Sequence, residues 1–119
     1  MKVTEQQIES VIEQKYFYNL GNAIAAECPD APQELINKAA CTTKCVLFLK
    51  NNFVIVGKYA CVDPSEYSKE LGEEYAYKDA FNQIWALEGY VLANLMKEKA
   101  ETDALLASLS EGDCDGCKI

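Results

Sequence analysis

The sequence predicts an α+β fold in which a β-hairpin packs against an N-terminal helix and a long C-terminal helix. Two runs rich in β-branched and aromatic residues, 45–49 and 53–56, are separated by a short polar turn, which is typical of a hairpin. A stripe of apolar residues at helical spacing, from Tyr77 to Met96, indicates a long helix with one buried face. Because a two-stranded ribbon is not stable alone, we expect the hairpin to be covered on two sides or to complete a larger sheet in an oligomer.

The first element is predicted to be an amphipathic helix over residues 5–18. Thr4 followed by Gln7 forms a capping box at its start. The aliphatic residues that follow at helical spacing are Ile8, Val11 and Ile12. Gly21 is expected to end this region. Between residues 21 and 40 the pattern is weaker, and only a short helix over 32–39 is predicted.

That short helix is expected to begin with a second capping box formed by Asp30, Pro32 and Gln33. Leu35 and Ile36 would then face inward.

The hairpin turn is predicted at residues 50–52, because Asn tolerates the positive φ that tight turns demand. Gly57 lies within the second strand pattern, where glycine indicates a bulge or the close approach of another backbone. Residues 59–62 are expected to continue this strand. Asp63 and Pro64 then stop the strand and start a short helix.

Leu71 and Gly72 are expected to end that short helix, and the long helix is predicted over residues 73–109, with a possible break at 100–103. Gly89 in its middle indicates close approach of another backbone. Residues 1–109 are therefore predicted to form one α+β domain, and the Gly- and Asp-rich residues 110–119 a flexible tail that contains cysteines.

Composition excludes several classes of function. The chain has 119 residues, half of them apolar, which is enough for one core. Its net charge is −8, and all eleven basic residues are Lys. An acidic chain without Arg offers little to a phosphate backbone, so direct nucleic-acid binding is not expected. The absence of His removes the commonest general base, and no Gly-rich phosphate loop, nucleophile elbow or paired-carboxylate motif is present, so we do not expect an enzyme or a bound cofactor.

No apolar run approaches the ~20 residues needed to cross a bilayer, and the N-terminus is polar. A soluble cytosolic protein that does not bind membranes is therefore expected. The cysteines lie at positions 28, 41, 45, 61, 114 and 117. Cys41, Cys45, Cys114 and Cys117 could form a four-thiolate zinc site or include a redox pair, but free thiols are the favoured interpretation, with no metal bound.

Three sequence motifs in order resemble a family of small tailed-phage proteins. They are Gly-Lys-Tyr-Ala-Cys-Val-Asp-Pro at 57–64, Ala-Tyr-Lys-Asp-Ala at 76–80, and Ile-Trp-Ala-Leu-Glu-Gly-Tyr at 84–90. The resemblance covers roughly Thr4 to Met96, and Thr42 and Thr43 before the first strand also fit it. It implies a phage protein with an accessory role in the host cytoplasm and transfers no catalytic residue. By analogy, small proteins of this kind act against host antiviral defences.

The candidate ligand-binding residues are Lys44, Lys58, Tyr59, Tyr77, Trp85 and Glu88. Glu88 lies within the apolar face of the long helix, where a carboxylate must find partners or shift its pKa. It either locks the helix to the hairpin or contacts a ligand. Further donors for an anion are Lys50, Lys69, Lys78, Thr42, Thr43 and the helix start at Ser65 and Glu66.

These features lead to two hypotheses of different classes. In the first, a homo-oligomeric phage protein binds and sequesters a small, nucleotide-like host signal between protomers. In the second, an acidic protein inhibitor or nucleic-acid mimic occludes a host enzyme. The net charge of −8 favours the second hypothesis, whereas the apolar strands and the supply of aromatic residues favour the first, which we adopt. The partner is thus a small host-derived molecule or a host protein.

Overall fold

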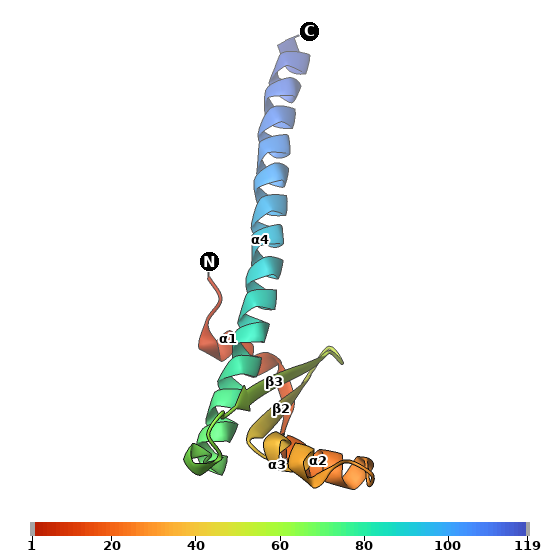
Figure 1. The fold of residues 1–119 in the computed structure, drawn as a ribbon. Helices are drawn as coiled ribbons and strands as arrows, with labels where there is room; N and C mark the ends of the chain where they lie inside the picture. Colours follow the sequence, from red (N-terminus) through yellow and green to blue (C-terminus); the bar gives the residue numbers. More distant parts are fainter. Residues whose placement is uncertain (1, 119) are drawn as a thin grey trace.

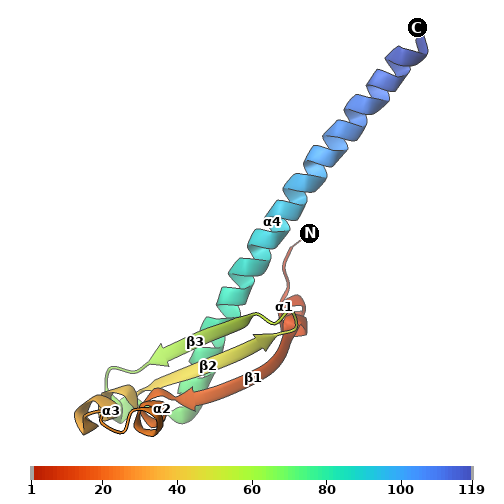
Figure 2. The same cartoon turned by 90° about the vertical axis from the view of Figure 1, so that its right-hand side faces the viewer.

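The computed structural model describes the backbone of residues 2–118 and the side chains of residues 2–110 (Figure 1). Its elements are α1 (Glu5–Val11), β1 (Ile12–Asn19), α2 (Leu20–Glu27), α3 (Gln33–Ala39), β2 (Thr42–Leu49), β3 (Val54–Ala60), the 3-10 helix η1 (Pro64–Glu66) and α4 (Lys69–Lys118). The three strands form an antiparallel sheet in the order β1-β2-β3. The first part of α4 covers one face of this sheet, and the rest extends beyond it (Figure 2). The predicted α+β class is confirmed.

The prediction that residues 5–18 form one helix is wrong in its second half. Thr4 accepts a hydrogen bond from the backbone of Gln7 as expected, but α1 ends at Val11. Residues 12–19 form β1, which pairs with β2 so that Phe17 lies opposite Cys45. β-branched and aromatic residues favour strands, and the free edge of the hairpin supplied a partner for them. Tertiary pairing therefore overrode the helical spacing of the aliphatic residues.

Gly21 does not end a helix but lies buried inside α2, which the sequence did not predict. A Cβ at Gly21 would lie 2.8 Å from backbone atoms of Ala40 and Ile36, so glycine allows α2 to meet the end of α3. The second capping box is also absent, because Pro32 is the N-cap of α3 and no side chain caps it. Leu35, predicted to face inward, is exposed, whereas Ile36 beside it is partly buried.

The hairpin is confirmed, and its register places Cys45 opposite Gly57. Asn52 in the turn has φ of 72°, the conformation expected of Asn. The close approach predicted at Gly57 is also confirmed, because a Cβ there would lie 2.5 Å from the backbone nitrogen of Ala80. α4 thus crosses β3 at this glycine.

The short helix after the hairpin begins at Asp63 and Pro64 as predicted, but the long helix begins earlier than predicted. Asp63 caps η1 by accepting hydrogen bonds from the hydroxyl and the backbone of Ser65, which lower the pKa of its carboxyl. Gly72 lies within α4, which begins at Lys69 and has no break at 100–103. The prediction for Gly89 is wrong, since a Cβ there would have no neighbour within 4 Å.

The core lies between α4 and the inner face of the sheet. Its buried residues are Val3, Ile8, Cys45, Leu47, Leu49, Ile55, Ala76, Ala80 and Ile84. The outer face carries exposed apolar side chains, including Tyr16, Phe48, Val54 and Val56. The chain by itself therefore covers the hairpin on one face only, and completion in an oligomer stays a prediction.

Two side chains of α4 hydrogen-bond the backbone of the edge strand β3. The Asp79 carboxylate accepts from the backbone N–H of Lys58 at 2.9 Å, and the Gln83 amide donates to the carbonyl of Val56 at 2.8 Å. An unpaired strand edge is prone to join other chains, and these contacts occupy part of it.

Within the described residues, no helix is both long and apolar enough to cross a membrane. The side chains of Cys114 and Cys117 lie outside the described part of the chain, so the thiol state predicted for them stays a prediction. The backbone of residues 110–118 continues α4, and the flexibility predicted for the tail at 110–119 also stays a prediction.

Candidate functional site

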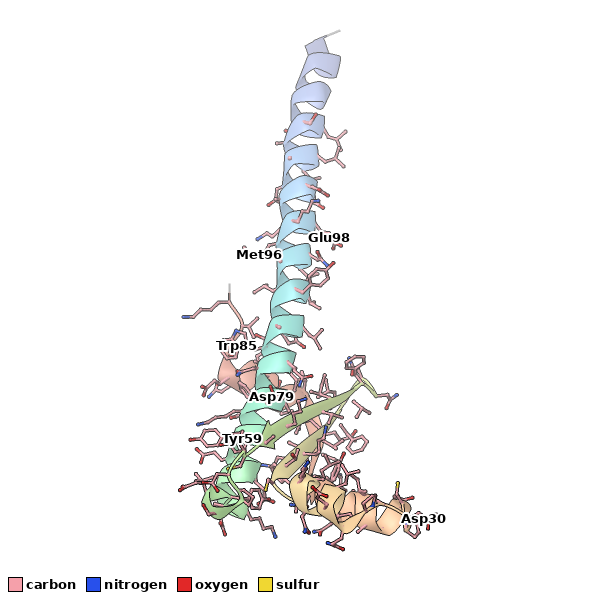
Figure 3. All side chains as sticks on the ribbon, viewed as in Figure 1. Asp30, Tyr59, Asp79, Trp85, Met96 and Glu98 are labelled. Carbon is pink, nitrogen blue, oxygen red and sulfur yellow. The ribbon has the colours of Figure 1, made fainter. Side chains whose placement is uncertain are left out.

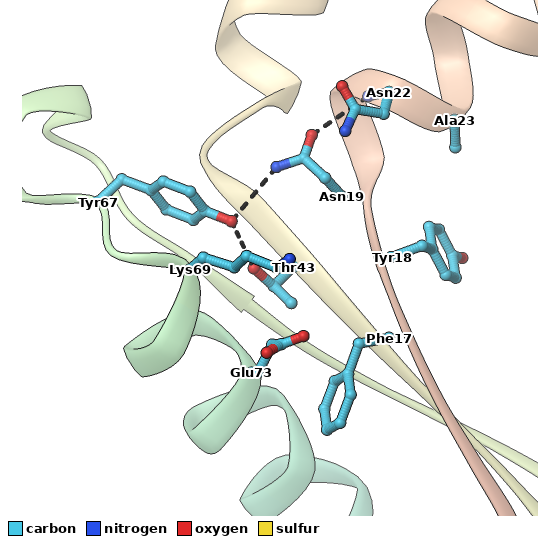
Figure 4. A pocket seen from close by; sticks show the side chains of 9 residues that line it. All are labelled: Phe17, Tyr18, Asn19, Asn22, Ala23, Thr43, Tyr67, Lys69 and Glu73. Atoms are coloured by element: carbon cyan, nitrogen blue, oxygen red, sulfur yellow. Dashed lines mark hydrogen bonds between the residues drawn. The ribbon is translucent and has the colours of Figure 1, made fainter.

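A pocket of about 610 Å³ opens where the end of β1 meets the starts of α2, β2 and α4 (Figure 4). It is lined by Phe17, Tyr18, Asn19, Asn22, Ala23, Thr43, Tyr67, Lys69 and Glu73. The strands bring the first three of these residues and Thr43 to the same end of the sheet, and the segment after η1 adds Tyr67. Three segments that are distant in the sequence, β1 with α2, the start of β2, and the start of α4 with Tyr67 before it, therefore build this pocket.

A hydrogen-bond network fixes one wall of the pocket. The Tyr67 hydroxyl shares a 2.9 Å hydrogen bond with the Thr43 hydroxyl and accepts one from the Asn19 amide at 3.3 Å. The same amide donates to the carbonyl of Ala40 at 2.7 Å, while the oxygen of Asn19 accepts from the backbone of Asn22 at 3.2 Å and caps α2. Thr43 is only 3% exposed. These polar groups are thus held in place before any ligand binds.

Glycine at position 72 allows α4 to reach this wall. A Cβ there would collide with the hydroxyl of Thr43 and lie 3.4 Å from the ring of Tyr67. Even an alanine would therefore displace the helix start or the hydroxyl. The position predicted as a helix end is a point of close packing beside the pocket.

The charged groups of the pocket come from the first turns of α4. Lys69 is its first residue, and Glu73 lies one turn later on the same side. The start of a helix carries unpaired N–H groups and partial positive charge, which favour an anion. Glu73 can accept hydrogen bonds from hydroxyl or amide groups of a ligand. The pocket therefore combines a cationic side, a carboxylate, fixed amides and aromatic rings.

The six residues predicted from the sequence do not come together in one chain. Lys44 and Lys58 are neighbours across β2 and β3 on the outer face, and Lys44 also lies beside Tyr18, which lines the pocket. Tyr59 is on the inner face, where its ring lies 4.9 Å from that of Tyr75.

The other three predicted residues belong to α4. Figure 3 labels Trp85, which lies on the helix near the end of the sheet. Tyr77 and Trp85 each pack against Phe81, and the ammonium of Lys15 lies 4.7 Å from the centre of the Tyr77 ring. Burial raises the pKa of Tyr77, and the nearby charges of Glu9 and Cys45 add to this shift. Glu88 is half-buried further along the helix. A shared pocket formed by these residues between protomers stays a prediction.

Part of the observed pocket can be predicted from local sequence patterns. Thr43 and Lys69 were recognised as possible donors to an anion. Asn19 and Phe17 were missed because their segment was predicted to be helical, and Tyr67 because no local pattern distinguishes it. The pocket depends on strand pairing between distant segments, which local patterns do not encode.

The described cysteines differ in their surroundings, from the exposed Cys28 to the buried Cys41 and Cys45. Burial raises the pKa of Cys45 to about 11, so its thiol stays protonated near neutral pH. The Cys61 thiol donates to the carbonyl of Asp63 at 3.1 Å and so helps to fix the corner after β3. Among the side chains that the structure describes, no cluster of three or more His, Cys, Asp or Glu could hold a metal ion.

The fold and pocket define a small α+β protein in which a three-stranded sheet, covered by one long helix, carries at its end a pocket of mixed polar and aromatic lining. Residues 3–96 match the model of the Phage protein (N4 Gp49/phage Sf6 gene 66) family, and the chain belongs to this family. Neither a curated protein nor a solved structure matches the chain. The expectation of a phage protein family is thereby confirmed.

Proposed function

We propose that this phage protein acts in the host cytoplasm against antiviral defence, by binding and sequestering a small nucleotide-like signal without chemical turnover. The observation that carries this proposal is the convergence of aromatic rings, fixed amides and a lysine in one pocket. Its volume of about 610 Å³ lies within the range of roughly 300–1,000 Å³ that is usual for small-molecule sites.

Each part of the pocket suits one part of a nucleotide. Phe17 offers an aromatic ring on the inner face on which a base can stack, and Tyr18 borders the pocket from the opposite face of β1. Asn22 offers an amide to the edge of the base, and Glu73 an acceptor for sugar hydroxyls. Lys69, at the positive start of α4, is suited to a phosphate.

The net charge of −8 opposes binding of an anion unless positive charge is gathered locally. Lys69 supplies such charge inside the pocket. Lys44 and Lys58 lie beside Tyr18 at the same end of the sheet but on its outer face. Sequestration needs only affinity, which agrees with a chain that has neither His nor Arg.

The proposal can be tested by calorimetry and native mass spectrometry with a panel of linear and cyclic nucleotides. We expect one panel member to bind and to be released chemically unchanged. Lys69→Gln should weaken its binding about tenfold or more, since a hydrogen bond to a charged group contributes about 1.5–3 kcal/mol. Tyr67→Phe, which breaks the network, should also weaken it. Lys99→Gln removes the same charge from an exposed position outside the pocket and should have little effect.

Equal affinity of the Lys69 and Lys99 variants would refute the assignment of the pocket. Release of an altered nucleotide would refute the non-enzymatic mechanism. The net charge favours one alternative, an acidic inhibitor or nucleic-acid mimic that occludes a host enzyme. Binding of no nucleotide, together with a stoichiometric complex with a host enzyme, would support that alternative.

A further inference from the structure

The face of α4 that packs on the sheet continues as an apolar stripe after the sheet ends. Ala80 and Ile84 on this face are buried in the core. The large apolar residues that follow on or beside the same face are Leu87, Val91, Leu95, Leu105, Leu106 and Leu109, which are 45 to 59% exposed. At 100° per residue these six positions fall within an arc of about 100° on one side of the helix. They form two clusters, 87–95 and 105–109, and Glu98 and Thr102 lie between the clusters on the same side. In Figure 3 the side chains around Met96 and Glu98, and those beyond them, face no other element of the chain.

The size of this stripe matches a protein interface. Half-exposed side chains of this size each offer on the order of 80–100 Å², so the six together offer roughly 500 Å² of apolar surface. The stems of flanking polar residues would increase the buried area toward the ~800 Å² that each partner of a stable interface contributes. An isolated helix in water gains nothing from such a stripe, because helices depend mainly on packing of their apolar face.

The length of the stripe indicates what kind of partner can cover it. From Leu87 to Leu109 it extends about 33 Å, at 1.5 Å per residue, so a partner that covers all of it must present an apolar surface of similar length, such as one face of a long helix. Among the described elements, α1, α2 and α3 have only seven or eight residues. The α4 helix of another copy has the required length and carries the same stripe. Glu98 lies within the stripe between its two apolar clusters, and Lys97 and Lys99 flank it, so the paired helices can bring charges of opposite sign together.

We propose that a second copy of this chain packs along the stripe, with two α4 helices paired over residues 87–109. This surface lies beyond the sheet, whereas the pocket lies at the first turns of α4. The pairing is therefore independent of the proposed ligand, and either proposal can fail without the other.

The test is the mass of the full chain in solution, measured by light scattering over a range of concentrations under reducing conditions. We expect twice the chain mass of 13.2 kDa or a higher even multiple. The double variant Leu95→Glu with Leu106→Glu places charges in the stripe and should release a 13.2 kDa monomer. Leu95→Ala, which keeps the helix, should raise the dissociation constant on the order of tenfold.

The matched control is the double variant Ala93→Glu with Ala104→Glu. Each position lies two residues before a mutated leucine, about 200° around the helix, and both alanines are exposed. This variant should keep the mass of the unmutated protein. A monomer at every concentration for the unmutated chain would overturn the proposal. An assembly that survives the stripe variant, or that the control disrupts equally, would also overturn it.

Discussion

Replacing Gly57 by alanine should destabilise the protein at the crossing of β3 and α4. The added Cβ would lie 2.5 Å from the backbone nitrogen of Ala80, 2.7 Å from its Cβ, and close to the carbonyl oxygen of Ala76. Ordinary contacts between carbon atoms are about 3.5–4.0 Å, so α4 must move by about 1 Å. Overpacking of this kind costs about 1–3 kcal/mol, and here backbone rather than flexible side chains opposes it. Alanine restricts the unfolded chain and returns up to about 1 kcal/mol, which leaves a net loss of about 2 kcal/mol.

The assay is equilibrium unfolding in urea at one fixed protein concentration. With a slope of about 2 kcal/mol/M, the midpoint of Gly57→Ala should fall by about 1 M. Gly89→Ala is the matched control, because a Cβ there has no neighbour within 4 Å and alanine favours a helix by about 1 kcal/mol over glycine. Its midpoint should rise by about 0.5 M. An unchanged midpoint for Gly57→Ala would refute the close approach of α4 to β3.

Further predictions concern the strand edge and the buried thiol. Asp79→Ala should lower the free energy of unfolding by about 1–2 kcal/mol relative to Asp103→Ala. The Asp103 variant is the control, because it measures the gain in helix propensity alone. Equal urea midpoints of the two variants would contradict a role of the Asp79 hydrogen bond. In the native protein at pH 8, iodoacetamide should modify the exposed Cys28 but not the buried Cys45, as read by peptide mass spectrometry, and equal labelling would contradict the packing of Cys45. The pKa of the Cys45 thiol is near 9.0 in the unfolded chain and about 11 in the folded protein, so its contribution to stability should be complete below pH 9 and be lost as the pH rises toward 11. Cys45→Ala should therefore reduce the fall of the unfolding free energy with pH between 9 and 11.

The candidate site was less predictable than the fold. Lys69 and Thr43 were identified from the sequence as donors, and Lys44 proved to be the cross-strand neighbour of a pocket residue. The network around Asn19 and Tyr67 joins residues 48 positions apart. Such contacts depend on the pairing of β1 with β2. This pairing was not predicted, because the apolar spacing at the start of β1 also fits a helix.

The glycine positions show what a local pattern can and cannot predict. Gly57 was correctly associated with a close backbone approach, because glycine within a strand has few other uses. The sequence predicts helix ends at Gly21 and Gly72, yet Gly21 lies inside α2 where it meets the end of α3, and Gly72 lies inside α4 where it meets Thr43. Gly89 was expected to contact another backbone and has no neighbour. A glycine marks an unusual position, but only the packed chain shows whether space, conformation or neither requires it.

The sequence by itself determined the hairpin, its Asn-containing turn, the capped corner at Asp63 and the long amphipathic helix. These features follow from backbone preferences and from hydrophobic spacing within a few residues. Only the tertiary structure decided that residues 12–19 form a third strand, that α2 follows it, and that a pocket forms where four elements meet. The physical reason is that a strand is completed by hydrogen bonds to a distant partner, so its stability is not a property of its own segment.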